Sequence, residues 1–230
     1  MRNRRLILIF ICACIMLANC GCSSAKQSAQ STKSATTTIE DSGLDLSKYK
    51  TLPIKANKTY TLKSNWDLKG ETYVLPEGVT LKSKGGVFKN GTLIGNNTQI
   101  DTKKPLFNKV SIMGYWNVPE ITTSMFASLD YENSLRDVLA LAHPEVMNKV
   151  VIEDGDYSVS AKSYKSALTV GSNISVVING NIRLKPNAYK GCFVFMIDNA
   201  TNVTLSGKGC IYGDKHDHKG VDGEWGMVYT

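Results

Sequence analysis

Residues 202–211 read NVTLSGKGCI, and the same pattern stands at 173–182 as NISVVINGNI and at 78–87 as GVTLKSKGGV. In each copy two apolar residues stand two apart, a glycine follows four positions after the second, and another apolar residue stands two beyond that glycine. The last two copies align without a gap, so that Asn173 matches Asn202 and Ile182 matches Ile211. Short alternating strands with glycine turns at a fixed period are typical of the turns of a solenoid. The pattern predicts an all-β chain of stacked parallel strands.

Two β-rich regions extend outward from these copies. In the first, residues 46–122, alternating runs such as 59–62, 72–75 and 92–94 are separated by Gly, Pro and Asn turn signals. In the second, residues 123–230, a short helical insert near 133–143 ends at a proline and is followed by the first coils of a β-helix. Because the chain stops inside an expected strand with no polar cap, we expect further coils to follow.

The N-terminus is typical of an export signal. Basic residues between Arg2 and Arg5 precede an apolar run that is too short to span a bilayer, and the run ends in Leu17-Ala18-Asn19-Cys20. This tetrapeptide resembles the lipobox of bacterial lipoproteins, which predicts lipidation of Cys20, although Cys22 is a competing position. We divide the region into a signal segment at 1–20 and a flexible Ser/Thr-rich tether at 21–45.

The second β-rich region resembles a known superfamily. An apolar strand followed by Gly155-Asp156-Tyr157 is similar to the entry of right-handed parallel β-helices of the pectin-lyase-like superfamily. The stretch from Asn202 to Asp214 resembles an early coil of polygalacturonase-like and related envelope β-helix proteins. The resemblance implies a right-handed parallel β-helix. Because this superfamily includes hydrolases, lyases and adhesins, it implies no single activity, and no catalytic residue is carried over.

One segment gathers side chains that could carry chemistry. The ligand-contact candidates are Asp214, His216, His218, Glu224 and Trp225, which lie among glycines in an expected loop. Tryptophan could stack on a sugar ring, and imidazoles near carboxylates could form an acid and base pair. The alternative is a solvated structural loop, since the spacing matches no fixed metal motif and we predict no metal site.

The charge and the cysteine content limit the possible binding partners and the possible disulfide bonds. The chain of 230 residues has 27 basic and 20 acidic residues, and the excess of +7 falls to +4 without the three arginines of the signal. This excess mildly favours a polyanion, but no basic-aromatic stripe indicates nucleic acid. Four of the six cysteines lie in the signal region. Cys192 and Cys210 remain, either as a disulfide or as separate thiols.

The sequence is therefore compatible with two functions. The first is an exported lipoprotein of the bacterial cell envelope, on the outer membrane, whose intact form hydrolyses or eliminates a polysaccharide, acidic or otherwise. No cofactor is expected, except calcium if the protein is a lyase. The second is a non-catalytic β-helix that binds glycan or builds the surface. In both, the membrane is contacted through the lipid anchor alone.

Overall fold

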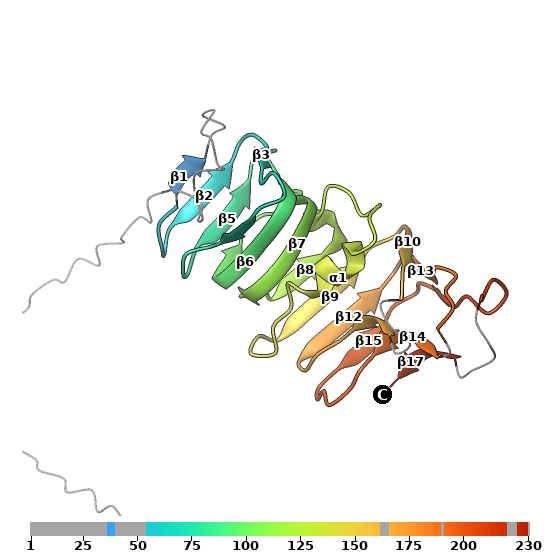
Figure 1. The fold of residues 1–230 in the computed structure, drawn as a ribbon. Coiled ribbons are helices and arrows are strands. Elements are labelled where there is room, and N and C mark those ends of the chain that lie inside the picture. The colour runs from blue at the N-terminus through green and yellow to red at the C-terminus, as the bar shows by residue number, and fades with distance from the viewer. Residues whose placement is uncertain (1–35, 40–53, 162–165, 190, 220–224, 230) are drawn as a thin grey trace, which may run out of the picture. The chain divides into compact units, whose positions relative to one another are not determined.

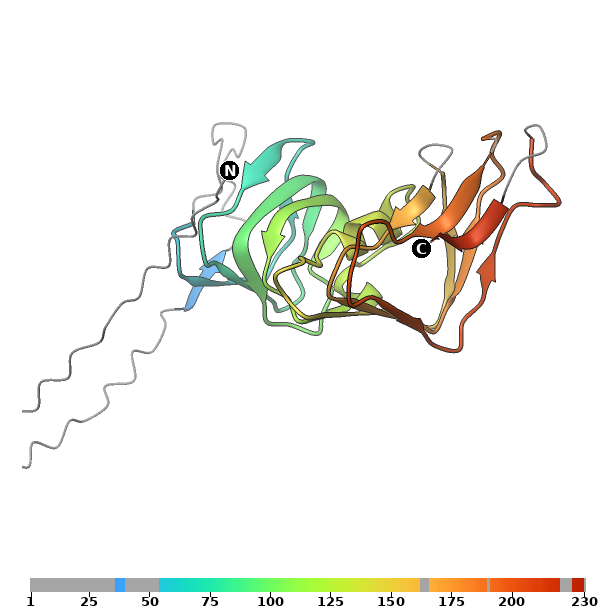
Figure 2. The same cartoon turned by 90° about the horizontal axis from the view of Figure 1, so that it is seen from below.

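All strand pairs that the structure describes are parallel. The computed structural model describes residues 36–39, 54–161, 166–189, 191–219 and 225–229, with the backbone alone at 36–39, 166 and 225–229. These residues belong to one compact unit, Ser34–Thr230. The strands stack as successive turns of a β-solenoid (Figure 1), and the second view shows the chain winding round the interior (Figure 2). The predicted parallel solenoid is confirmed.

The N-terminal coils are short. Partners on adjacent strands stand closer in sequence here, as Phe88 and Phe107 do, than in the later coils, where Val176 pairs with Leu205. The N-terminal coils form one sheet of seven strands. Its strands are β1 (Thr36–Ile39), β2 (Thr59–Leu62), β3 (Trp66–Asp67), β4 (Thr72–Val74), β5 (Thr80–Ser83), β6 (Phe88–Ile100) and β7 (Phe107–Trp116).

The C-terminal coils are longer and contribute to three separate sheets. One sheet holds β8 (Glu120–Thr122), β9 (Asn148–Ile152), β12 (Ile174–Ile178) and β15 (Thr204–Ser206). A second holds β10 (Asp156–Val159), β13 (Asn181–Leu184) and β16 (Ile211–Tyr212). The third holds β11 (Ser166–Thr169), β14 (Cys192–Met196) and β17 (Trp225–Tyr229).

The gapless alignment of the last two sequence copies is the observed register. Val176 pairs with Leu205, and Ile182 pairs with Ile211, as that alignment requires. The same separation does not hold for every turn, since Val176 stands nearer in sequence to Val150, its partner on the preceding coil, than to Leu205. The first copy includes β5, in the part of the chain where the coils are shorter. Coils can differ in length because extra residues between two strands lengthen the loop without changing the pairing.

The core follows the alternation of the strands. Val150, Val176 and Ile182 are fully buried, and Leu205 is partly buried against the same cluster. Trp116 is fully buried and Trp66 is 7% exposed, so both rings pack in the core. Successive side chains of a strand point to opposite faces, so every second residue of a coil faces the interior.

Asparagines hold the tight corners of neighbouring coils. Asn173 and Asn202 have φ values of 61° and 57°, a left-handed conformation that asparagine tolerates better than most residues. The carboxamide of Asn202 donates to Oδ1 of Asn173 at 3.0 Å, and that of Asn173 donates to the carbonyl of Pro144 at 2.7 Å. The corners are therefore linked along the stack by side-chain hydrogen bonds.

Helix α1 (Ser134–Leu139) confirms the helical insert but is shorter than the predicted 133–143. Leu141 and Ala142 donate to carbonyls three residues back, so the last turn tightens before Pro144. The helix contacts β7, β10 and β11, and therefore lies within the stack where a strand would otherwise stand (Figure 1). Leu135 and Val138 face the core as the spacing predicts.

The structure describes residues 36–39 of the predicted tether. These residues form β1, which pairs in parallel with β2, because a run of three threonines and an isoleucine favours an extended chain. The signal segment, both candidate lipidated cysteines and the rest of the tether lie outside the described residues. No helix within the described part of the chain is long and apolar enough to cross a membrane.

Candidate functional site

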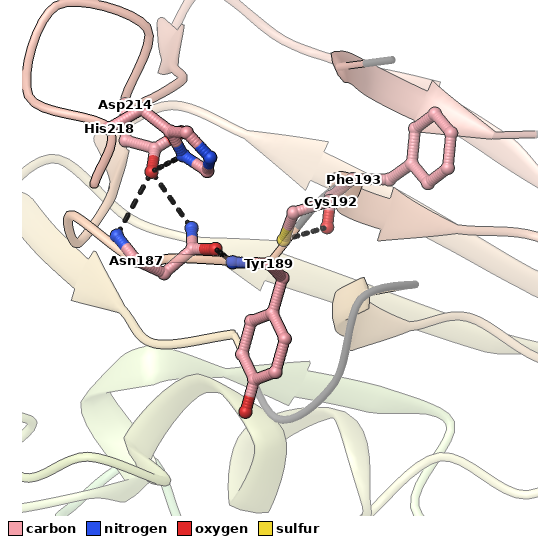
Figure 3. Close-up of polar contacts among 6 residues, drawn as sticks. All are labelled: Asn187, Tyr189, Cys192, Phe193, Asp214 and His218. Atoms are coloured by element: carbon pink, nitrogen blue, oxygen red, sulfur yellow. Dashed lines mark hydrogen bonds and ion pairs between the residues drawn. The ribbon is translucent and has the colours of Figure 1, made fainter. Parts of the chain in front are cut away.

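Asp214 is the centre of a buried polar cluster beside β14 and β16 (Figure 3). Its Oδ2 atom accepts hydrogen bonds from the backbone N–H of Asn187 at 3.1 Å and from the Asn187 carboxamide at 2.8 Å. The same oxygen lies 2.9 Å from Nδ1 of His218, and the side chains of both residues are at most 5% exposed. Asp214 therefore fastens the loop at 213–219 to the chain at 185–189.

A backbone contact strengthens this attachment. Lys219 donates its N–H to the carbonyl of Asn187 at 2.9 Å, and Asp217 donates its N–H to the carbonyl of Asp214 at 2.9 Å. A buried carboxylate needs several donors to offset the loss of its hydration, and Asp214 has them within the protein. The geometry fits a structural clamp at the base of the loop.

The structure brings together only some of the candidates predicted from sequence. Asp214 and His218 are brought together by the contact between their side chains. His216 is exposed in the turn between them and takes no part in that contact. Glu224 lies outside the described residues. Trp225 begins β17, where its backbone pairs with Cys192, and its side chain is not described. Within the described ranges, no group of three or more His, Cys, Asp or Glu residues could hold a metal ion.

The two cysteines of the folded region are separate free thiols, one buried and one exposed. Cys192 is 1% exposed, and its Sγ lies 3.8 Å from the carbonyl oxygen of Phe193. Burial, followed by the negative charge of Asp214, raises the pKa of Cys192 to about 11. Because the thiolate is the reactive form, this buried thiol is a poor nucleophile.

A second polar surface lies on the outer face of the β10–β13–β16 sheet. The guanidinium carbon of Arg183 lies 4.4 Å from the centroid of the Tyr212 ring, which is 37% exposed. Arg183 and Tyr212 are register partners on adjacent strands. One row away, the carboxamide of Asn181 donates to Oδ1 of Asp156 at 2.9 Å. We call Asp156, Asn181, Arg183 and Tyr212 the outer polar face.

None of the four residues of this face was among the candidates predicted from the sequence. Arg183 alternates with buried Ile182 and Tyr212 alternates with Ile211, so the period of two marks both as outward-facing. The gapless alignment that matches Ile182 with Ile211 also matches Arg183 with Tyr212, so their pairing could have been found from the sequence. A hydrogen bond with the Cys210 thiol, more than any other cause, raises the pKa of Tyr212.

The outer polar face offers an array of groups suited to a hydroxylated ligand. A tyrosine ring provides an apolar surface with a polar tip, a guanidinium donates hydrogen bonds, and a carboxylate and a carboxamide accept them. No protein-family model, curated protein or solved structure matches this chain. The parallel β-solenoid is therefore supported by the strand pairing within this chain.

Proposed function

We propose that this chain is an exported β-solenoid that binds a polysaccharide on its outer polar face. The observation that carries the proposal is Tyr212, an exposed ring that contacts the Arg183 guanidinium on a parallel sheet. A ring that is already ordered loses little conformational entropy when a ligand packs on it. Shallow contacts repeated along rigid coils suit a linear polymer, and Asp156 and Asn181 add polar partners in the next row.

Membership of the pectin-lyase-like superfamily is part of the same proposal. The parallel solenoid supports it, together with the resemblance of residues 202–214 to an early coil of polygalacturonase-like proteins. The export signal and Cys20 support a lipoprotein of the bacterial cell envelope, on the outer membrane. In this setting the solenoid meets extracellular or envelope glycan while its lipid anchor holds it at the membrane.

A catalytic role for the intact protein is the alternative. Hydrolysis of a glycosidic bond needs two suitably spaced carboxyl groups, and elimination in this superfamily would call for calcium. The Asp214 carboxylate accepts hydrogen bonds from Asn187 and contacts His218. These interactions favour a structural role for Asp214 over an acid or base role. The observation that favours binding is the exposed outer polar face itself.

Calorimetric titration with neutral and acidic oligosaccharides tests the proposal. Tyr212→Ala should weaken binding about tenfold, roughly 1.4 kcal/mol, because the ligand loses its stacking surface. Tyr189→Ala is the matched control, since Tyr189 is 40% exposed but lies outside the three strands. Equal losses in the two variants, or no binding by the wild-type protein, would contradict the proposal. Release of reducing or unsaturated ends would favour an enzyme.

A further inference from the structure

Lysines occupy one corner of three successive N-terminal coils. Leu62 pairs with Ser83, so Lys63 and Lys84, which follow them, stand at the same position one coil apart. The backbone N–H of Lys84 donates to the carbonyl of Leu62 at 2.8 Å, which holds this register at the corner. Two lysines from successive coils are therefore neighbours along the stack.

The next coil continues the series. Leu81 pairs with Ile100 before the corner and Phe88 pairs with Phe107 after it, so the two corners have the same length and correspond without a gap. Lys103 then stands next to Lys84, and Lys104 follows it. All four side chains are exposed. We call Lys63, Lys84, Lys103 and Lys104 the lysine column.

The acidic residue nearest in sequence to Lys103 and Lys104 is engaged elsewhere. Asp101, the nearest carboxylate in sequence, lies 2.5 Å from Nζ of Lys82. None of the ion pairs found among the described residues includes Lys84, Lys103 or Lys104. The corner segments 84–87 and 102–106 contain no Asp or Glu. The positive charge of these three lysines therefore faces solvent along this part of the solenoid.

Such an arrangement carries an electrostatic cost. Adjacent strands lie about 4.8 Å apart, and like charges directly opposite each other on neighbouring strands are destabilising. In water the repulsion is modest and salt screens it, but each added coil repeats it. A ligand with negative charges at a similar repeat would relieve this repulsion at every coil.

We propose that the lysine column binds a linear anionic glycan whose acidic groups recur once per sugar along the solenoid axis. A sugar unit in an extended chain is similar in length to the strand spacing of about 4.8 Å, so successive carboxylates meet successive lysines. Duplex DNA is a poorer match, because the phosphates of each strand recur about every 3.4 Å along the helix axis and wind round it. This goes beyond the proposed function, since it concerns a second surface and a defined charge repeat.

A carboxylate marks one end of the lysine column. Phe107 bridges to Phe126, which places residues 122–124 at the corresponding corner of the following coil. There Oε2 of Glu153 accepts hydrogen bonds from the backbone N–H of Ser124 at 2.7 Å and from Oγ1 of Thr123 at 3.0 Å. The negative charge of Glu153 would repel an anionic chain, so the bound segment should cover the lysines and end before this coil.

Binding to polygalacturonate, which carries one carboxylate per sugar, tests the inference. The triple variant Lys84→Gln, Lys103→Gln, Lys104→Gln should bind at least about tenfold more weakly than wild type at low salt. The dependence of log K on log salt should fall by roughly 2 to 3, because about one counterion is released for each charge contact. The fully methyl-esterified polymer, which has the same backbone without charge, should not compete.

A matched triple variant controls for net charge. Lys149→Gln, Lys185→Gln, Lys208→Gln removes the same charge from exposed positions on the C-terminal coils and should retain most of the affinity. Tyr212→Ala should leave the salt dependence of polygalacturonate binding unchanged, which separates this inference from the proposed function. Equal losses in both triple variants, tighter binding of duplex DNA, or no binding of polygalacturonate by the wild type would overturn it. Unchanged melting temperatures confirm that the variants remain folded.

Discussion

Leu93 and Ile94 are neighbours on β6 that face opposite sides of the sheet. Leu93 is fully buried, whereas Ile94 is partly exposed and stands in register with exposed Val74 and Met113. Leu93→Ala should lower the free energy of unfolding by about 2 to 5 kcal/mol, because it leaves a cavity in the core. Ile94→Ala, which mainly removes strand propensity, should cost less than about 1.5 kcal/mol. Urea titrations measure both, and similar losses would mean that the inward and outward faces are misassigned.

Cys192 gives the stability a pH dependence. Its pKa is raised from an ordinary 9.0 to about 11 in the folded chain, so between these values the unfolded chain loses the thiol proton first. Ionisation then favours the unfolded state, and the contribution of Cys192 to stability should fall as the pH rises through this window. Cys192→Ala should flatten that fall in urea titrations across the same window. An unchanged pH profile would mean that Cys192 ionises equally in both states.

The same burial separates the reactivity of the two thiols of the folded region. Cys210 is exposed and should react with iodoacetamide in the native protein, whereas Cys192 should react only after unfolding. Peptide mapping by mass spectrometry identifies the labelled positions and distinguishes them from the cysteines of the signal region. Rapid native labelling of Cys192 would contradict its placement in the core.

At the scale of the element, α1 interrupts the ladder of strands and replaces its hydrogen bonds with charged side chains. Oδ1 of Asp137 accepts the backbone N–H of Ile112 on β7 at 3.1 Å. On the other side, Nε of Arg136 donates to the carbonyl of Ala167 on β11 at 2.8 Å, and Nη2 donates to the carbonyl of Ser160. An acidic and a basic residue therefore satisfy backbone groups that a strand would otherwise pair.

Asp137 tests this role of the helix. Asp137→Ala leaves the buried N–H of Ile112 without its acceptor and should lower the free energy of unfolding by about 1 to 3 kcal/mol. Asp137→Asn keeps a carbonyl oxygen at the same position and should cost less. Thermal denaturation followed by circular dichroism compares the two variants. Equal losses would indicate that the charge of Asp137, rather than its acceptor atom, holds the helix in the stack.

At the scale of the whole molecule, the N-terminal cysteines decide where the solenoid is held. Cys20→Ala should release the exported protein from membranes, because stable anchoring needs more than one acyl chain and these would be attached at the lipidated cysteine. Metabolic labelling with a fatty acid, followed by fractionation, measures both effects. Cys22→Ala is the matched control and should retain the label. Label that persists in Cys20→Ala and disappears in Cys22→Ala would assign the anchor to Cys22.

The class of fold and the inward face of the strands in the repeated copies could be predicted from the sequence. Alternation with period two and turns at glycine and asparagine are local signals, and in a solenoid each coil contacts only its neighbours. The pairing of Val176 with Leu205 and of Ile182 with Ile211 could therefore be predicted from the alignment of two sequence copies. For the same reason, residues that alternate with these buried positions could be expected on the surface.

Where coils differ in length, the tertiary structure sets which outward-facing residues become neighbours. The separation in sequence between paired strands is smaller at Phe88 and Phe107 than at Val176 and Leu205, because the length of each loop sets it. The lysine column and the bonds of Asp214 to Asn187 join residues in different coils or loops. Local sequence patterns specify which way a side chain points, but contacts between coils depend on a register that local patterns do not contain.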